Sequence, residues 1–181
     1  MEDLTVYEER TKLWVENIVI GLNFCPFAAK PFKSDLIEYQ VSEAITARKL
    51  FEDFLQCLQR LVDLDPQDIA TSLLIHPFVL LKLEAYLDFF AEAEALLEES
   101  GADQVVQIAG FHPVYIFDGI PIDHISNYTN RSPYPMIHLI RAEQVELARH
   151  TYPGIEQIPA KNIELLEAMG WEKFRVLFNS I

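Results

Sequence analysis

Apolar side chains recur every three to four positions in five stretches of the chain, and this spacing predicts amphipathic helices. The first helix is expected over about 6–20, behind the capping-box pair Thr5 and Glu8, and the second follows Ser42 as its cap. Three more are expected over about 83–99, 143–150 and 160–169. The stripes that would face the core in the first two helices are Leu13, Trp14, Ile18, Val19 and Leu22, then Ile45, Leu50, Phe51, Phe54, Leu58 and Leu61.

Short segments rich in β-branched residues alternate with these helices and predict strands over about 36–41, 69–75, 104–109 and 135–140. The last segment fits a helix equally well by its period, but Pro133 and Pro135 favour a strand. Strands that alternate with helices indicate βαβ units. We therefore expect a single α/β domain over residues 1–181, with a mixed β-sheet of about four to five strands covered by helices.

The excess of acidic residues disfavours some classes of binding partner. The chain has 28 acidic and 14 basic residues, which gives a formal net charge of −14. This argues against a binder of nucleic acid or of anionic membranes, because affinity for phosphate backbones rests on clustered Lys and Arg. No apolar run approaches the roughly 20 residues that span a bilayer. The acidic first ten residues do not form a signal peptide, and two cysteines make no disulfide framework, so we expect a cytoplasmic protein.

The segment 111–141 differs from the rest of the chain in composition. It holds three of the five histidines and four of the ten prolines, whereas its only acids are Asp118 and Asp123. A stiff loop that is poor in carboxylates and rich in His, Arg, Asn and Tyr is typical of a binding surface. A small anion is the expected ligand, and the sequence indicates no particular cofactor and no oligomeric state.

Three polar residues fall at or just past the ends of predicted strands, namely His76, His112 and Arg141. Ligands of open α/β sheets collect at the carboxyl ends of parallel strands. If the strands concerned are parallel, these residues share one edge of the sheet, and a site is expected there.

Three motifs resemble the signatures of the bacterial domain-of-unknown-function family 1415. They are NFCPFA at 23–28, FHP at 111–113, and NRSPYP at 130–135 followed by HLIR at 138–141. The resemblance spans residues 14–170 and implies a bacterial, single-domain, cytoplasmic protein, but no activity. One departure is that the family pattern has an acid directly after the arginine at 141, where this chain has Ala142 and then Glu143.

Cys25 is the first candidate for chemistry. Pro26 is favoured as the first residue of a helical turn, so Cys25 would cap that turn with free N–H groups beside its sulfur. That environment lowers a thiol pKa. Cys25 would then be the nucleophile, with His112 as its base. The alternative is a small apolar residue packed between Phe24 and Phe27.

Arg131 and Arg141 are the candidate anion ligands, because a guanidinium donates bidentately to carboxylate or phosphate. The alternative is that each ties the fold to an acid or to backbone carbonyls. His138, in a predicted strand on the face of Met136 and Ile140, is expected to be structural more often than functional. The residues proposed to contact the ligand are Asn130, Arg131, Ser132, Tyr134, His138 and Arg141.

Three functions are therefore in competition. The first is a cysteine-dependent hydrolase or transferase that acts on a small anionic molecule at Cys25 and His112. The second is a metal-site enzyme whose three ligands would be Cys25, His112 and His138. The third is a non-catalytic binding module that uses the Arg131 loop. The anionic-ligand site ranks first, with catalysis at that site left open.

Overall fold

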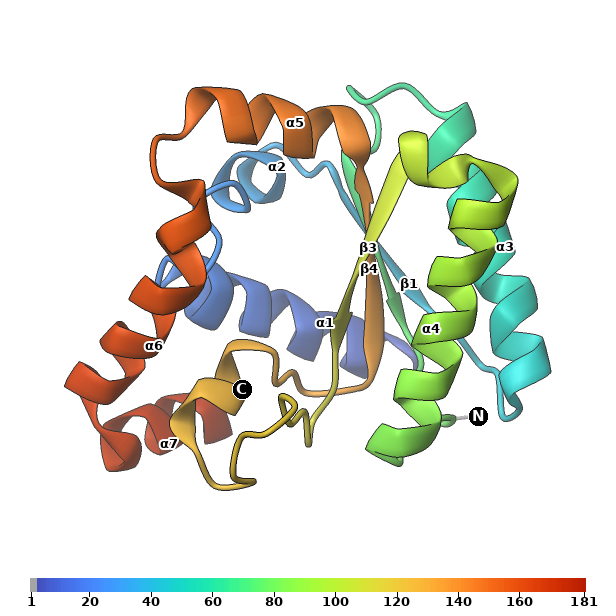
Figure 1. Cartoon of the computed structure of the whole chain (residues 1–181). Coiled ribbons are helices and arrows are strands. Elements are labelled where there is room, and N and C mark those ends of the chain that lie inside the picture. Colours follow the sequence, from blue (N-terminus) through green and yellow to red (C-terminus); the bar gives the residue numbers. More distant parts are fainter. Residues whose placement is uncertain (1–2) are drawn as a thin grey trace.

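The computed structural model describes residues 3–181 and contains one four-stranded mixed sheet with helices on both of its faces (Figure 1). This confirms the expected α/β fold. The strands are β1 (Ile37–Val41), β2 (Thr71–Ile75), β3 (Val106–Phe111) and β4 (Met136–Arg141). The helices are α1 (Thr5–Trp14), continued by a π-helical turn (Val15–Ile20), α2 (Ala29–Lys33), α3 (Ala47–Asp63), α4 (Leu83–Ser100), α5 (Ala142–Thr151), α6 (Ile158–Met169) and α7 (Trp171–Asn179).

The strand order is β1-β2-β4-β3, and β4 runs against all the others. β1 and β2 pair in parallel, whereas β4 is antiparallel to both β2 and β3. The carboxyl ends of β1, β2 and β3 therefore meet the start of β4 at one edge. His76 and His112 follow strands that end at this edge, but Arg141 ends β4 at the opposite edge. The expectation that all three residues share one edge is wrong, because it required β4 to be parallel.

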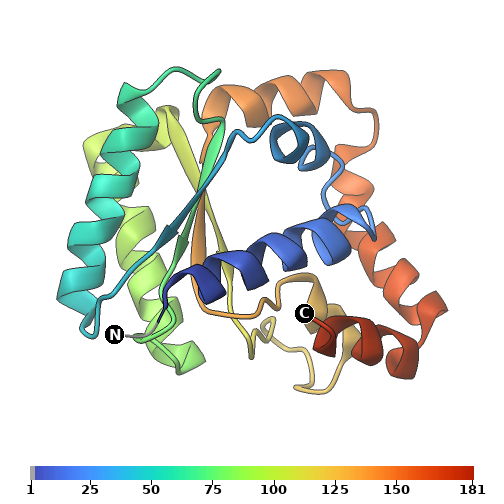
Figure 2. The same cartoon turned by 180° about the vertical axis from the view of Figure 1, so that it is seen from behind.

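The two faces of the sheet are covered differently (Figures 1 and 2). α3 and α4 cover one face, and residues such as Phe54, Tyr86 and Leu97 pack there against Ile137 and Leu139 of β4. On the other face lie α1, α2, α5, α6 and α7. Trp14, Ile18, Leu166 and Phe174 form the second core with Met136 on that face. Successive residues of β4 point to opposite faces, so the strand contributes to both cores.

Some local details differ from the sequence expectations. Thr46 caps α3, since its hydroxyl accepts from the Lys49 N–H, whereas the predicted cap Ser42 donates to the Asp53 carboxylate. α1 begins without the Thr5–Glu8 capping box; the Asp3 carboxylate accepts from Thr5 instead. α2 and α7 are additional helices that the spacing did not predict. Within residues 3–181, no helix is long and apolar enough to cross a membrane.

Candidate functional site

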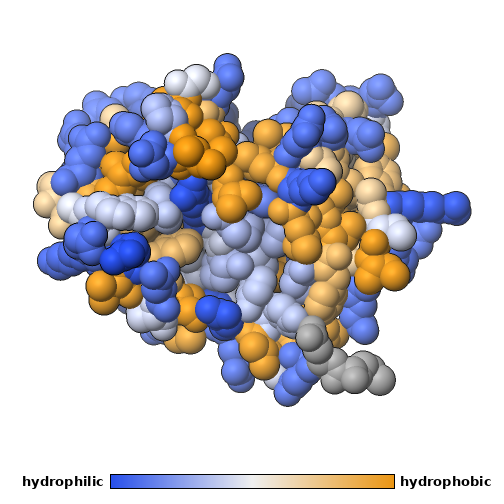
Figure 3. All heavy atoms as spheres, turned by 90° about the horizontal axis from the view of Figure 1, so that it is seen from below, coloured by the Kyte–Doolittle hydropathy of each residue, from blue (hydrophilic) through white to orange (hydrophobic). Residues whose placement is uncertain are grey.

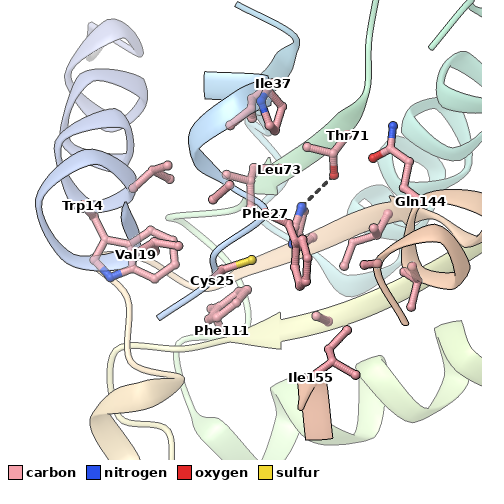
Figure 4. Close-up of a pocket in the computed structure, with 18 residues that line it drawn as sticks. Trp14, Val19, Cys25, Phe27, Ile37, Thr71, Leu73, Phe111, Gln144 and Ile155 are labelled. Carbon is pink, nitrogen blue, oxygen red and sulfur yellow. Dashed lines mark hydrogen bonds between the residues drawn. The ribbon is translucent and has the colours of Figure 1, made fainter. Parts of the chain in front are cut away.

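A cavity of about 320 Å³ lies against the face of the sheet opposite α3 and α4 (Figure 4). Its floor comes from the strands, and its walls come from the α1 region, the 25–31 segment, α5 and the turn before α6. The lining residues are Trp14, Val15, Val19, Cys25, Phe27, Ala28, Pro31, Ile37, Thr71, Leu73, Ala109, Phe111, His138, Ile140, Gln144, Val145, Ala148 and Ile155. None of them is Asp, Glu, Lys or Arg, so the cavity is almost wholly apolar.

Cys25 lines this cavity, and Figure 4 shows its sulfur pointing into the space that the side chains surround. Asn23, at a φ of 55°, turns the chain after the π-helical segment, and the Cys25 N–H then bonds to the Val19 carbonyl at 3.3 Å. The backbone N–H groups of Phe27 and Ala28 lie close enough to the sulfur to favour its charged form, which would lower the thiol pKa, as the Cys-Pro sequence predicted. Burial is the larger influence, however, and it raises the pKa of the Cys25 thiol above its ordinary value. The expected lowering of the pKa is therefore wrong.

His138 lines the same cavity from β4, opposite Leu73 of β2 and Ala109 of β3. Its Nε2 lies 2.6 Å from the hydroxyl of Thr71, the bond drawn as a dashed line in Figure 4. The Thr71 hydroxyl in turn donates to the Leu139 carbonyl at 2.6 Å. Burial lowers the pKa of His138 to about 4, so the ring is neutral at neutral pH.

His112 lies on the other face of the sheet and does not meet Cys25. Its ring packs 5.1 Å from that of Tyr86 on α4, whereas Ala109 and Phe111 of β3 face the cavity. The Val114 N–H donates to Nδ1, and Nε2 bonds to the Leu80 carbonyl. Both ring nitrogens therefore hold the loop after β3, and the predicted pairing of His112 as a base with Cys25 is wrong.

Arg131 holds the 112–130 loop closed. Its guanidinium is buried and donates to the carbonyls of Tyr115 and Ile122, while it stacks 4.2 Å from the ring centre of Tyr128. Arg131 therefore ties the fold to backbone carbonyls, which was the alternative to its binding an anion. Figure 3 views the end of the molecule at which the loop lies, where apolar patches alternate with hydrophilic ones.

Arg141 is buried at the far end of β4, where it closes the carboxyl end of α3. It donates to the Leu64 carbonyl at 2.7 Å and twice to the Ile69 carbonyl, at 3.0 and 3.2 Å. Because β4 advances by about 3.3 Å per residue, Arg141 lies on the order of 15 Å from the start of that strand. Arg131 precedes the start, so the two arginines do not bind one small anion together, and that expectation is wrong.

The remaining predicted ligand contacts are internal hydrogen bonds and ring contacts. The Asn130 amide donates to the Gly110 carbonyl, and the Ser132 hydroxyl donates to the Tyr134 carbonyl. The Tyr134 ring packs edge-on against Tyr7 at 4.9 Å. These residues brace the loop and do not line the cavity. In the described part of the chain there is also no group of three His, Cys, Asp or Glu placed to hold a metal ion, and Cys25, His112 and His138 do not converge.

Two polar residues of the cavity, Thr71 and Gln144, were not singled out by the sequence analysis. Thr71 is the first residue of β2 and is followed by Ser72, so the sequence pattern does not distinguish it from an ordinary polar residue at the start of a strand. Its partner His138 is 67 positions away, and only the pairing of β2 with β4 brings them together. Gln144 follows Arg141 on the first turn of α5, where a polar residue is ordinary.

Comparison with known proteins supports the resemblance of the motifs. No curated protein and no solved structure matches this chain. A family model described as a protein of unknown function, DUF1415, matches residues 6–176, which include every motif quoted above. The chain belongs to the DUF1415 family.

Proposed function

We propose that this protein binds a small, largely apolar molecule in the cavity beside Cys25 and His138. The observation that carries the proposal is the cavity itself, with about 320 Å³ lined by apolar side chains and only a few polar groups. Binding sites for small molecules have this composition, since the apolar wall supplies affinity and the few polar groups orient the ligand. An anionic ligand is disfavoured, because no lining residue is basic and both candidate arginines donate to backbone carbonyls.

Binding of the neutral fluorescent probe N-phenyl-1-naphthylamine tests this proposal. We expect saturable binding of one probe per chain, and at least a tenfold weaker affinity in Ala109→Phe, because residue 109 faces the cavity from β3. Ala95→Phe is the matched control, since Ala95 is exposed on α4 beyond the other face of the sheet. A probe that does not bind the wild-type protein, or that binds Ala109→Phe equally well, contradicts the proposal.

A cysteine-dependent transferase or hydrolase is the second candidate function. It is favoured by one observation, that Cys25 and His138 line the same cavity. His138 would then be the base in place of His112. The raised pKa of the thiol opposes this function, because the nucleophile is the thiolate.

The reactivity of Cys25 separates the two candidates. We expect iodoacetamide to alkylate Cys25 more slowly than free glutathione at pH 7, and the rate to rise steeply only as the pH exceeds the ordinary thiol value. Peptide mapping by mass spectrometry resolves Cys25 from the buried Cys57, which serves as the unreactive internal reference. Alkylation of Cys25 faster than glutathione at pH 7 would place the catalytic function first.

A further inference from the structure

We infer that the cavity selects a neutral ligand that donates a hydrogen bond, through a hydroxyl or an N–H group, to Nδ1 of His138. This inference rests on the proposed function and names the class of molecule that the cavity takes. It depends on which nitrogen of the His138 ring carries the proton, and the neighbouring hydrogen bonds determine that position.

The Thr71 hydroxyl fixes the tautomer of His138. A hydroxyl has one proton, and the Leu139 carbonyl 2.6 Å away can only accept, so the Thr71 proton lies on that bond. Nε2 of His138, also 2.6 Å from the same hydroxyl oxygen, must then be the donor. The proton of the neutral ring is therefore on Nε2, and Nδ1 carries a free lone pair.

Nδ1 of His138 forms no hydrogen bond within residues 3–181. Protein atoms do not enclose this nitrogen completely. The ring lines the cavity, so this nitrogen is reached from the cavity. An acceptor in an apolar cavity that lacks a donor is unfavourable. A ligand hydroxyl or N–H group removes this unfavourable free energy, because it donates the hydrogen bond that Nδ1 lacks.

The lack of basic side chains in the cavity disfavours an anionic ligand. An anion that entered would leave water and meet no basic side chain, since no Lys or Arg lines the cavity. It would also face the lone pair of Nδ1. Burial keeps the imidazole neutral, so it offers no compensating positive charge at pH 7. A carboxylate is therefore expected to bind far more weakly than a neutral donor of the same shape.

Three naphthalene compounds of similar shape test this inference by calorimetric titration of the full chain at pH 7. We expect 2-naphthol to bind about three- to tenfold more tightly than naphthalene, the effect of one hydrogen bond. We expect 2-naphthoate to bind at least tenfold more weakly than 2-naphthol. His138→Leu should bind 2-naphthol and naphthalene with equal affinity, because it removes the acceptor for the hydroxyl.

A second variant and a direct readout keep the test decisive if His138→Leu does not fold. Thr71→Val removes the hydroxyl that fixes the tautomer, so the preference for 2-naphthol over naphthalene should shrink. The ¹⁵N spectrum of the wild-type imidazole should show the proton on Nε2 before the ligand is added. A proton on Nδ1 overturns the inference, as does equal affinity for 2-naphthol and naphthalene or tighter binding of 2-naphthoate. In those cases the apolar site still stands, whereas failure of naphthalene, 2-naphthol and N-phenyl-1-naphthylamine to bind would refute the proposed function itself.

Discussion

Acidification from pH 7 to pH 4 is expected to destabilise the folded protein, and His76 and His138 should contribute about 3 kcal/mol each. Burial lowers the pKa of both His76 and His138 from 6.5 to about 4. Between these values the unfolded chain binds protons that the folded chain does not. The stability that the neutral rings provide is therefore complete above pH 6.5 and is lost as the pH falls toward 4.

The surroundings of His76 explain its low pKa. The ring is fully buried and stacks on Tyr86, with 5.8 Å between the ring centres. Nδ1 lies 3.1 Å from the Val79 carbonyl and must donate to it, so Nε2 is the unprotonated nitrogen. Nε2 is buried and has no hydrogen-bond partner among residues 3–181, so a proton added there would find no acceptor in this part of the chain. His112 lies nearby and would add repulsion if it were charged.

Urea unfolding at a series of pH values measures this effect. Each histidine contributes a slope of about 1.4 kcal/mol per pH unit between pH 4 and 6.5. His76→Leu and His138→Leu should each reduce the slope by that amount. His150→Gln is the surface control, because the His150 side chain is 74% exposed. If both leucine variants keep the wild-type slope, the two histidines are not neutral in the folded protein.

Replacement of Arg141 by methionine is expected to lower the free energy of unfolding by about 3 kcal/mol. Methionine keeps most of the apolar stem but removes all three hydrogen bonds to the Leu64 and Ile69 carbonyls. Hydrogen bonds from a charged donor are the stronger kind, and the Leu64 carbonyl belongs to the residue that caps the carboxyl end of α3. The end of α3 should therefore loosen from β4.

The control for this variant is Arg149→Met, on the exposed side of α5. Arg149 pairs with the exposed Glu146, at 3.5 Å, so its loss should change stability by no more than roughly 0.5 kcal/mol. Urea unfolding at pH 7 compares the two variants. Under conditions where it is folded, Arg141→Met should bind N-phenyl-1-naphthylamine as the wild-type protein does. A stable Arg141→Met variant that loses ligand binding would show that Arg141 serves a ligand after all.

The sequence by itself determined the α/β class, the position of all four strands and the family, because these depend on local patterns. Alternation along a strand also predicted that His138 lies on the same face as Met136 and Ile140. The Cys-Pro pair predicted the N–H groups at the Cys25 sulfur. Each of these follows from residues within a few positions of one another, where backbone geometry fixes the direction of the side chain.

Only the tertiary structure decided which of these residues meet. The antiparallel direction of β4 separates Arg141 from Arg131 and brings His138 beside Thr71. The alternation of β3 at its end sends His112 to Tyr86 and away from Cys25. The direction of the pKa shift of the Cys25 thiol depended on how far tertiary contacts bury the sulfur, because burial outweighs the nearby N–H groups. Strand direction, pairing and burial are set by contacts between distant segments, and no local pattern encodes them.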